Sequence, residues 1–151
     1  MIKFCLEKWD GNKDLLEKHL RDHSNLGSVN YIDLVKMVVG IIFNTDSFTI
    51  YDVDKITEID NGDYQGTLLY LIPDDSYQPY EGDYLMTYVG YGSCSGCDTL
   101  QSIQSFIYSD EDVPDRVISD FMTLCKDIVS NTIRPYNHGW RYDPMFDVVE
   151  Y

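Results

Sequence analysis

The segment that decides the fold is FTIYDVDKITEIDNGDYQGTLLYLI, residues 48–72. Residues 48–59 and 65–72 are rich in β-branched and aromatic side chains, which favour strands. Between them, Asp60-Asn61-Gly62-Asp63 contains the Asn-Gly pair typical of a tight hairpin. We therefore expect an antiparallel hairpin whose second strand ends at Pro73, because proline cannot donate a ladder hydrogen bond.

The segments around the hairpin predict a third strand and two preceding helices. Residues 84–91 have the composition of a strand and follow a polar loop rich in Asp, Pro and Tyr. Apolar residues at helical spacing predict one helix over residues 12–25, capped by Asp10 or Asn12, and another over residues 31–43. The middle of the chain is therefore expected to form a three-stranded antiparallel meander.

Two further helices are predicted after the sheet. Asp98, with Gln101 three residues on, fits a capping box that opens the first of them. Pro114 introduces the second, whose apolar stripe consists of Val117, Ile118, Phe121, Leu124, Cys125 and Ile128. The apolar residues 145–151 are expected to pack or to add an edge strand. The sequence thus predicts an α+β fold with two N-terminal helices, a β-meander and two C-terminal helices.

Length and composition predict one packed domain over residues 1–151 in a reducing compartment. Apolar residues make up 44% of the chain, more than disordered chains contain. The longest apolar run, residues 38–43, is far shorter than the ~20 residues that cross a bilayer, and residues 1–7 lack a signal-peptide hydrophobic region. We expect a cytoplasmic protein whose four Cys are reduced thiols.

The formal charge of −15 is unevenly distributed along the chain. Residues 1–40 are neutral overall, whereas residues 41–91 contain ten acidic and one basic side chain. Residues 92–151 contain ten acidic and four basic side chains. Such a field repels nucleic acid and anionic membranes and speeds encounter with a basic partner, although it also simply favours solubility.

The most specific motif is Cys94-Ser95-Gly96-Cys97, a C-x-x-C between the third strand and the following helix. A helix N-terminus stabilises a thiolate, so a thiol-redox interpretation is open. The motif nevertheless lacks a preceding βαβ crossover, an aromatic residue directly before Cys94 and a strand-starting proline after it. A structural interpretation makes Gly92 and Gly96 the joints of a tight turn, with both Cys side chains tucked inward.

A zinc-site interpretation of the same motif adds two further ligands to Cys94 and Cys97. Structural zinc takes four sulfur or nitrogen donors, so the two further ligands would be drawn from Cys5, Cys125 and His138. The chain contains no second C-x-x-C, and Cys125 falls on a predicted apolar stripe. No phosphate-binding glycine loop, nucleophile elbow or Ser/His/Asp arrangement is visible either. We therefore expect a protein that is not an enzyme and has no cofactor.

The candidate binding residues are acidic side chains interleaved with tyrosines in the loop after the second strand. They are Asp74, Asp75, Tyr77, Tyr80, Glu81 and Asp83, with Asp110, Glu111 and Asp112 as a second patch. Carboxylates spaced on rigid structure can imitate the phosphates of a nucleic acid, and tyrosines supply aromatic anchors. The alternative is that both segments are ordinary solvated loops.

Two segments resemble small, uncharacterised bacteriophage-encoded proteins. These are Asp60-Asn61-Gly62-Asp63-Tyr64-Gln65-Gly66-Thr67 and Tyr91-Gly92-Ser93-Cys94-Ser95-Gly96-Cys97-Asp98-Thr99-Leu100-Gln101. The resemblance implies a phage setting and the cytoplasm of a host cell, and it assigns no functional residue. Small acidic phage proteins without catalytic motifs often block a host enzyme, including defence enzymes that act on nucleic acids.

The leading hypothesis is therefore an acidic phage-type inhibitor that occupies the basic surface of a nucleic-acid-binding host or defence enzyme, as an anti-CRISPR or other anti-defence protein does. It implies no direct contact with nucleic acid or membrane. The alternative is a thiol-redox or zinc-binding protein centred on Cys94 and Cys97. A sponge for an anionic small molecule ranks lower, because eleven Lys and Arg offer few cationic ligands.

Overall fold

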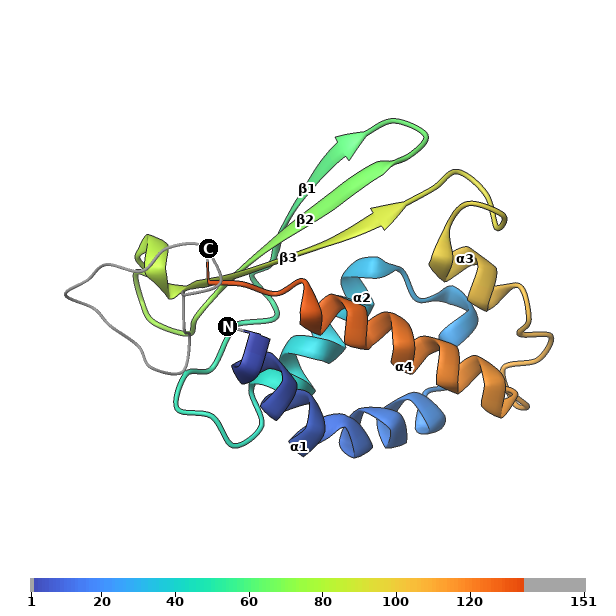
Figure 1. Cartoon of the computed structure of the whole chain (residues 1–151), viewed down its shortest axis with the longest axis horizontal. Helices are drawn as coiled ribbons and strands as arrows, with labels where there is room; N and C mark the ends of the chain where they lie inside the picture. The colour runs from blue at the N-terminus through green and yellow to red at the C-terminus, as the bar shows by residue number, and fades with distance from the viewer. Residues whose placement is uncertain (1, 135–151) are drawn as a thin grey trace.

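A computed structural model describes residues 2–134, apart from the side chains of Ile2 and Glu81. Its helices are α1 (Ile2–Asp22), α2 (Tyr31–Met37), α3 (Thr99–Gln104) and α4 (Asp115–Ser130), and its strands are β1 (Thr57–Gly62), β2 (Gly66–Pro73) and β3 (Tyr84–Tyr91). The strands form one antiparallel sheet in the order β1-β2-β3. The helices gather on one side of this sheet (Figure 1). The predicted α+β fold is confirmed; the predicted edge strand at residues 145–151 lies outside the described residues.

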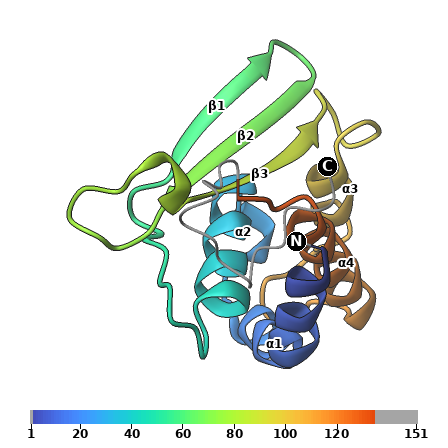
Figure 2. The ribbon, with the colours of Figure 1, turned by 60° about the vertical axis from the view of Figure 1, so that its left-hand side comes forward.

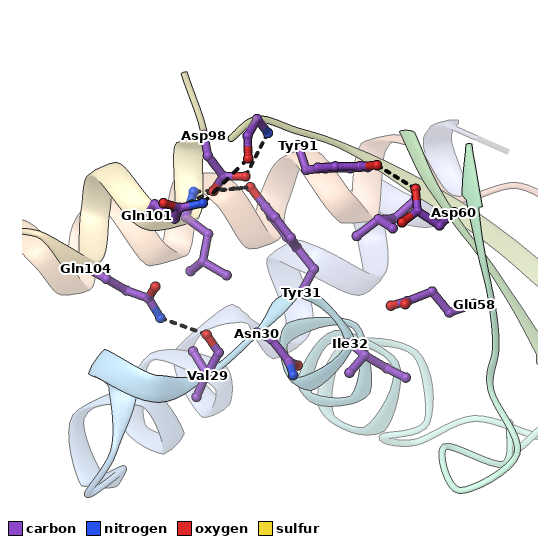
Figure 3. Close-up of a pocket in the computed structure, with 13 residues that line it drawn as sticks. Val29, Asn30, Tyr31, Ile32, Glu58, Asp60, Tyr91, Asp98, Gln101 and Gln104 are labelled. Carbon is purple, nitrogen blue, oxygen red and sulfur yellow. Dashed lines mark hydrogen bonds between the residues drawn. The ribbon is translucent and has the colours of Figure 1, made fainter. Parts of the chain in front are cut away.

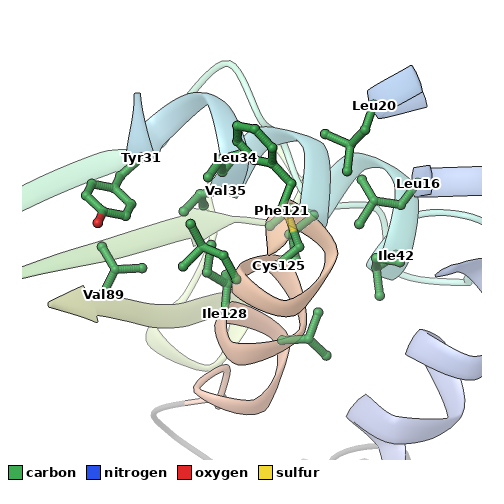
Figure 4. Close-up of a cluster of buried hydrophobic side chains, with 14 of the residues drawn as sticks. Leu16, Leu20, Tyr31, Leu34, Val35, Ile42, Val89, Phe121, Cys125 and Ile128 are labelled. Carbon is green, nitrogen blue, oxygen red and sulfur yellow. The ribbon is translucent and has the colours of Figure 1, made fainter. Parts of the chain in front are cut away.

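The core lies between α4, α2 and the helix-facing side of the sheet. Every apolar residue of the stripe predicted for α4, from Val117 to Ile128, is buried. Leu34 and Val35 of α2 and Val89 of β3 pack around the same cluster (Figure 4). Burial of a contiguous apolar stripe is what holds a helix of this spacing against a sheet. Among residues 2–134, no helix is long and apolar enough to span a membrane.

Helix α1 begins at Ile2, so the predicted start at residue 12 is wrong. Asp10-Gly11-Asn12 suggested a cap, yet these residues lie inside the helix. Trp9 and Cys5 are buried about two and three turns before Leu16, and the amide of Asn12 donates to the carbonyl oxygen of Ile42 at 3.1 Å. This packing outweighs the cost of about 1 kcal/mol for Gly11 in a helix interior.

The helix predicted over residues 31–43 is present, with a change of winding along its length. Asn30 caps α2 through a capping box with Asp33. The second half, Val38–Phe43, continues as a π-helix. Val39, Ile42 and Phe43 are buried there against α1. The π-helical segment therefore contributes to the hydrophobic core.

Strand β1 begins at Thr57, so the strand predicted from residue 48 is wrong in its first nine residues. The side-chain amide of Asn44 makes two hydrogen bonds with the backbone of Tyr51. It accepts from the N–H at 2.8 Å and donates to the carbonyl oxygen at 2.9 Å. The side chain of Asp52 then accepts from the N–H of Asp54, which turns the chain. Only Tyr51 pairs, as an isolated bridge with Asp74. The β-forming composition was correct, but side chains satisfy the backbone groups that a ladder would use.

The hairpin is present, but its turn is longer than the Asn-Gly pair predicts. Asn61 and Gly62 are the last residues of β1, and the turn consists of residues 63–65. A Cβ added to Gly62 would lie 2.2 Å from the carbonyl oxygen of Gln65. The two strands can therefore close only where Gly62 faces Gly66.

Candidate functional site

An acidic groove opens between the hairpin end of the sheet and helices α2 and α3. Its volume is about 490 Å³. Tyr31 and Ile32 of α2, Glu58 and Asp60 of β1, and Gln101 of α3 are among the residues that line it (Figure 3). Sequence reasoning did not find this groove, because its walls come from three segments far apart in the chain.

Two of the three carboxylates that line the groove, Glu58 and Asp60, come from alternate residues of β1. Asp60 accepts a hydrogen bond of 2.6 Å from the hydroxyl of Tyr91, and this bond to a carboxylate raises the pKa of Tyr91 to about 12. Glu58 stands opposite Tyr70 in the neighbouring strand. The hydroxyl of Tyr70 is buried and makes no hydrogen bond among the described residues; burial, followed by the nearby carboxylate of Glu58, raises its pKa.

Glu58 and Asp60 face the helices, although the alternation of polar and apolar residues along β1 predicts that they face solvent. In Thr57-Glu58-Ile59-Asp60, the single apolar residue would ordinarily face the core. Ile59 instead lies on the outer side and is 45% exposed, while Glu58 and Asp60 share the helix-facing side with Leu68. All six residues of β1 are exposed. Its orientation is therefore set by the ladder with β2, and only that pairing register could have revealed the groove.

Asp98 lines the groove and joins α2, α3 and the end of β3, and only 4% of its surface is exposed. One carboxylate oxygen accepts from the Tyr31 hydroxyl at 3.0 Å and from the Gln101 N–H at 2.9 Å. The other accepts from the Gly92 N–H at 2.9 Å. The Asp98 half of the predicted capping box is thus confirmed, whereas the side chain of Gln101 donates to the carbonyl oxygen of Gly92 at 3.5 Å. The side chain of Asp98 also ties α2 and the end of β3 together.

Replacing Tyr31 with Phe is expected to reduce the loss of stability in alkali. Burial raises the pKa of Tyr31 to about 12, against about 10 in an unfolded chain. The contribution of Tyr31 is therefore complete below about pH 10 and falls as pH rises toward about 12, because the unfolded state ionises first. Urea unfolding at about pH 8 and about pH 11.5 should show a smaller decrease for the variant. An equal decrease in both proteins would contradict this role for Tyr31.

Only some of the predicted binding residues in the loop between β2 and β3 are exposed to solvent. Asp75, Tyr77 and Tyr80 are exposed, Tyr77 to 95%. Asp74 is half-buried and accepts from the backbone N–H of Ser76. The side chain of Glu81 lies outside the described part of the structure.

Asp83 does not belong to that surface, which corrects the sequence prediction. It is 6% exposed, accepts from the Tyr80 N–H at 2.8 Å and lies 3.9 Å from the guanidinium of Arg134. Its carboxylate therefore holds the loop in shape and is covered by protein. A binding role predicted from acidic composition fails here because composition does not tell which carboxylates turn inward.

The second predicted patch lies at a different end of the molecule. Asp110, Glu111 and Asp112 are exposed in the turn between α3 and α4. That turn and the loop before β3 lie on opposite sides of the molecule in both views (Figures 1 and 2). The two acidic segments do not form one patch, and the groove lies at the same end of the sheet as the hairpin turn.

The structure brings the two motif cysteines together but not the other proposed zinc ligands. The sulfur atoms of Cys94 and Cys97 are 3.0 Å apart and both residues are exposed, so the prediction that they are tucked inward is wrong. Cys5 and Cys125 are buried in the core. No three His, Cys, Asp or Glu side chains gather as a metal site within residues 2–134, and His138 lies outside them.

Charge is segregated between the two halves of the fold. Residues 56–115, which build the sheet, its loops and α3, contain twelve Asp and Glu and no Lys, Arg or His. Helix α1, by contrast, balances its charges in pairs such as Lys18 with Asp22 at 2.7 Å. Arg21 extends this balance to Asp115 of α4 at 2.8 Å. We refer to residues 56–115 as the acidic half.

Neither a scan against protein-family models nor searches of curated proteins and of solved structures finds a match to the chain. Its function is therefore inferred from its own residues and geometry.

Proposed function

We propose that the chain is an acidic binding protein of phage type that acts in the cytoplasm of a host cell. It would inhibit a host or defence protein that handles nucleic acid by occupying the basic surface meant for the nucleic acid. Charge pairing would come from the acidic half, and exposed tyrosines beside its carboxylates would anchor the contact.

The observation that carries the proposal is the acidic half itself. This segment of sixty residues contains no cationic side chain of its own, and the ion pair that the structure describes at one of its exposed carboxylates joins Asp115 to Arg21 of α1. On β1, Glu58 and Asp60 are two residues apart on a strand, about 7 Å along its axis. This separation resembles that of successive phosphates along a nucleic-acid strand. A basic groove that binds phosphates would therefore contact negative charges at about the spacing of phosphates.

Aromatic side chains stand next to these carboxylates at both ends of the sheet. Tyr64 is exposed in the hairpin turn beside Asp63, and Tyr77 and Tyr80 are exposed in the loop that contains Asp75. Tyrosines at an interface supply contact area with little loss of conformational freedom. Charges would then govern encounter and the tyrosines would slow dissociation.

Capture from host lysate at low salt, followed by competition, tests the proposal. We expect a retained protein that is released by added duplex DNA or RNA and by high salt. The Debye length falls from about 10 Å at 0.1 M salt to about 3 Å at 1 M, so surface charge pairing should weaken strongly. The purified chain should also displace a fluorescent duplex from the retained protein.

Retention that neither nucleic acid nor salt reverses would contradict mimicry. So would a retained protein whose duplex remains bound when the chain is added in excess.

A further inference from the structure

The loop that connects β3 to α3 holds two thiols side by side at the surface. Cys94 and Cys97 are exposed, and their sulfur atoms lie 3.0 Å apart. A disulfide bond is about 2.05 Å long, so the atoms need to approach by only about 1 Å to form one. The pair is therefore placed for a reversible intraloop disulfide.

The loop is closed on itself by its own backbone. The carbonyl oxygen of Cys94 accepts from the N–H groups of Cys97, at 3.1 Å, and of Asp98, at 2.8 Å. Asp98 reaches back to the N–H of Gly92 at 2.9 Å. A Cβ on Gly92 would lie 2.4 Å from the carbonyl oxygen of Cys97 and 2.9 Å from its sulfur. Only glycine at residue 92 lets the chain hold the two cysteines in this tight turn.

The two sulfur atoms differ in their surroundings. The sulfur of Cys97 accepts from the backbone N–H of Cys94 at 3.2 Å and lies 3.7 Å from the hydroxyl of Ser93. Hydrogen bonding from the Cys94 thiol, and then from the Ser93 hydroxyl, lowers the pKa of Cys97. In its protonated form the Cys97 thiol can instead donate to the Cys94 carbonyl at 3.4 Å. Donors that gather on Cys97 make it the sulfur suited to carry the negative charge.

The other two cysteines, Cys5 and Cys125, are buried, and their pKa values are raised. Burial raises the pKa of Cys5 to about 11 and that of Cys125 to about 12. Both side chains pack in the hydrophobic core. Thiols that are buried and protonated are unreactive, so any exchange chemistry should be confined to the surface pair.

We propose that Cys94 and Cys97 form a thiol–disulfide exchange site for small neutral or cationic disulfides, with Cys97 as the attacking sulfur and Cys94 as the resolving one. The preference for neutral or cationic disulfides follows from the position of the loop in the sequence. It lies within the acidic half, which contains twelve carboxylates and no cationic side chain. An anionic disulfide would be repelled there, and a cationic one attracted.

The exchange balances as follows. The Cys97 thiolate attacks one sulfur of the disulfide, whose S–S bond breaks; a mixed disulfide forms on Cys97, and the leaving thiolate takes a proton. Cys94 then loses its proton to solvent and attacks the Cys97 sulfur, which expels the second thiolate. The protein dithiol loses two electrons and two protons, and the small disulfide becomes two thiols.

Trapping with cystamine, a cationic disulfide, tests the assignment on the full chain. Reduced protein is treated, quenched with acid, alkylated and analysed by mass spectrometry. We expect wild type to form the Cys94–Cys97 disulfide and Cys94→Ser to accumulate a stable cysteamine adduct on Cys97. In Cys97→Ser, the adduct on Cys94 should form about tenfold more slowly, because its thiolate lacks the same donors.

Matched variants separate the sulfur chemistry from general effects on the loop. In the Cys94→Ser background, Ser93→Ala should slow adduct formation, while Ser95→Ala in the same exposed loop should not. Glutathione disulfide, which is anionic, should react more slowly than cystamine, and high salt should reduce that difference. Since all substituted residues are exposed, their thermal midpoints should stay close to that of wild type.

Several outcomes would overturn the inference. Wild type could retain both thiols in the presence of cystamine, or Cys94 could react as fast as Cys97. Cys5 or Cys125 could also react first, which would show that the surface pair is not the reactive one. Faster reaction with glutathione disulfide would contradict the charge preference. None of these results depends on whether the acidic half binds a partner.

Discussion

Replacing Asp98 with Ala is expected to lower the free energy of unfolding by about 3–5 kcal/mol, because each buried donor left unpaired costs about 1–3 kcal/mol. The substitution removes the acceptor of the Gly92 N–H, the Gln101 N–H and the Tyr31 hydroxyl. Urea unfolding at neutral pH measures the loss. The same variant should form the Cys94–Cys97 disulfide more slowly, because Asp98 no longer holds the loop at Gly92.

Two controls identify the cause of that loss. Asp98→Asn keeps the shape of the side chain and one carbonyl acceptor, so it should lose less stability than Asp98→Ala. Asp110→Ala removes an exposed carboxylate from the neighbouring turn and should change stability by less than about 0.5 kcal/mol. If Asp98→Ala were no more destabilised than Asp110→Ala, Asp98 would not be the joint between α2, α3 and β3.

Neutralising four carboxylates of the acidic half is expected to weaken partner binding about tenfold to a hundredfold at low salt, since each exposed charge pair contributes about 0.2–1 kcal/mol. The substitutions are Glu58→Gln, Asp60→Asn, Asp63→Asn and Asp75→Asn, which lie on β1, in the hairpin turn and in the loop before β3, and which leave out the acidic turn on the opposite side of the molecule. They raise the net charge from −15 to −11 (−15 + 4). Most of the loss should appear in the association rate and should disappear at high salt.

A charge-matched variant shows whether position or total charge matters. Its substitutions are Glu7→Gln, Asp10→Asn, Asp14→Asn and Asp127→Asn, all exposed and all on α1 or α4. It also has a net charge of −11 (−15 + 4). Compared with the first variant at about 0.15 M salt, where the Debye length is about 8 Å, it should keep an affinity within about threefold of wild type, because charges outside the contact surface are then largely screened. Equal losses in both variants would mean that the acidic half is not the contact surface.

The sequence was sufficient for those elements whose local pattern and packing agree. Strand β3 occupies the predicted residues 84–91, and α4 buries the whole predicted stripe behind Pro114. Where packing overrides a local signal, the prediction failed. The Asp10-Gly11-Asn12 segment looks like the start of a helix and lies in the middle of α1. Tertiary contacts of the preceding turns decide that boundary, and they are not visible in local sequence.

The candidate site was less accessible to sequence reasoning than the fold. Acidic composition indicated the loop around Asp75 as a candidate, but it could not distinguish the exposed Asp75 from the buried Asp83. The groove carboxylates Glu58 and Asp60 belong to an edge strand whose facing depends on its register with β2. Register and burial come from long-range pairing, so they are settled only in three dimensions.

The most direct test of the central proposal is to cross-link the captured complex with a zero-length carbodiimide and to identify the joined residues by mass spectrometry. This reagent joins only carboxylates and lysines that are already in contact. The acidic-half proposal predicts links from Glu58, Asp63 or Asp75 to lysines in the nucleic-acid groove of the partner. Links that arise instead from Glu7, Asp14 or Asp127, or that reach lysines outside that groove, would contradict it.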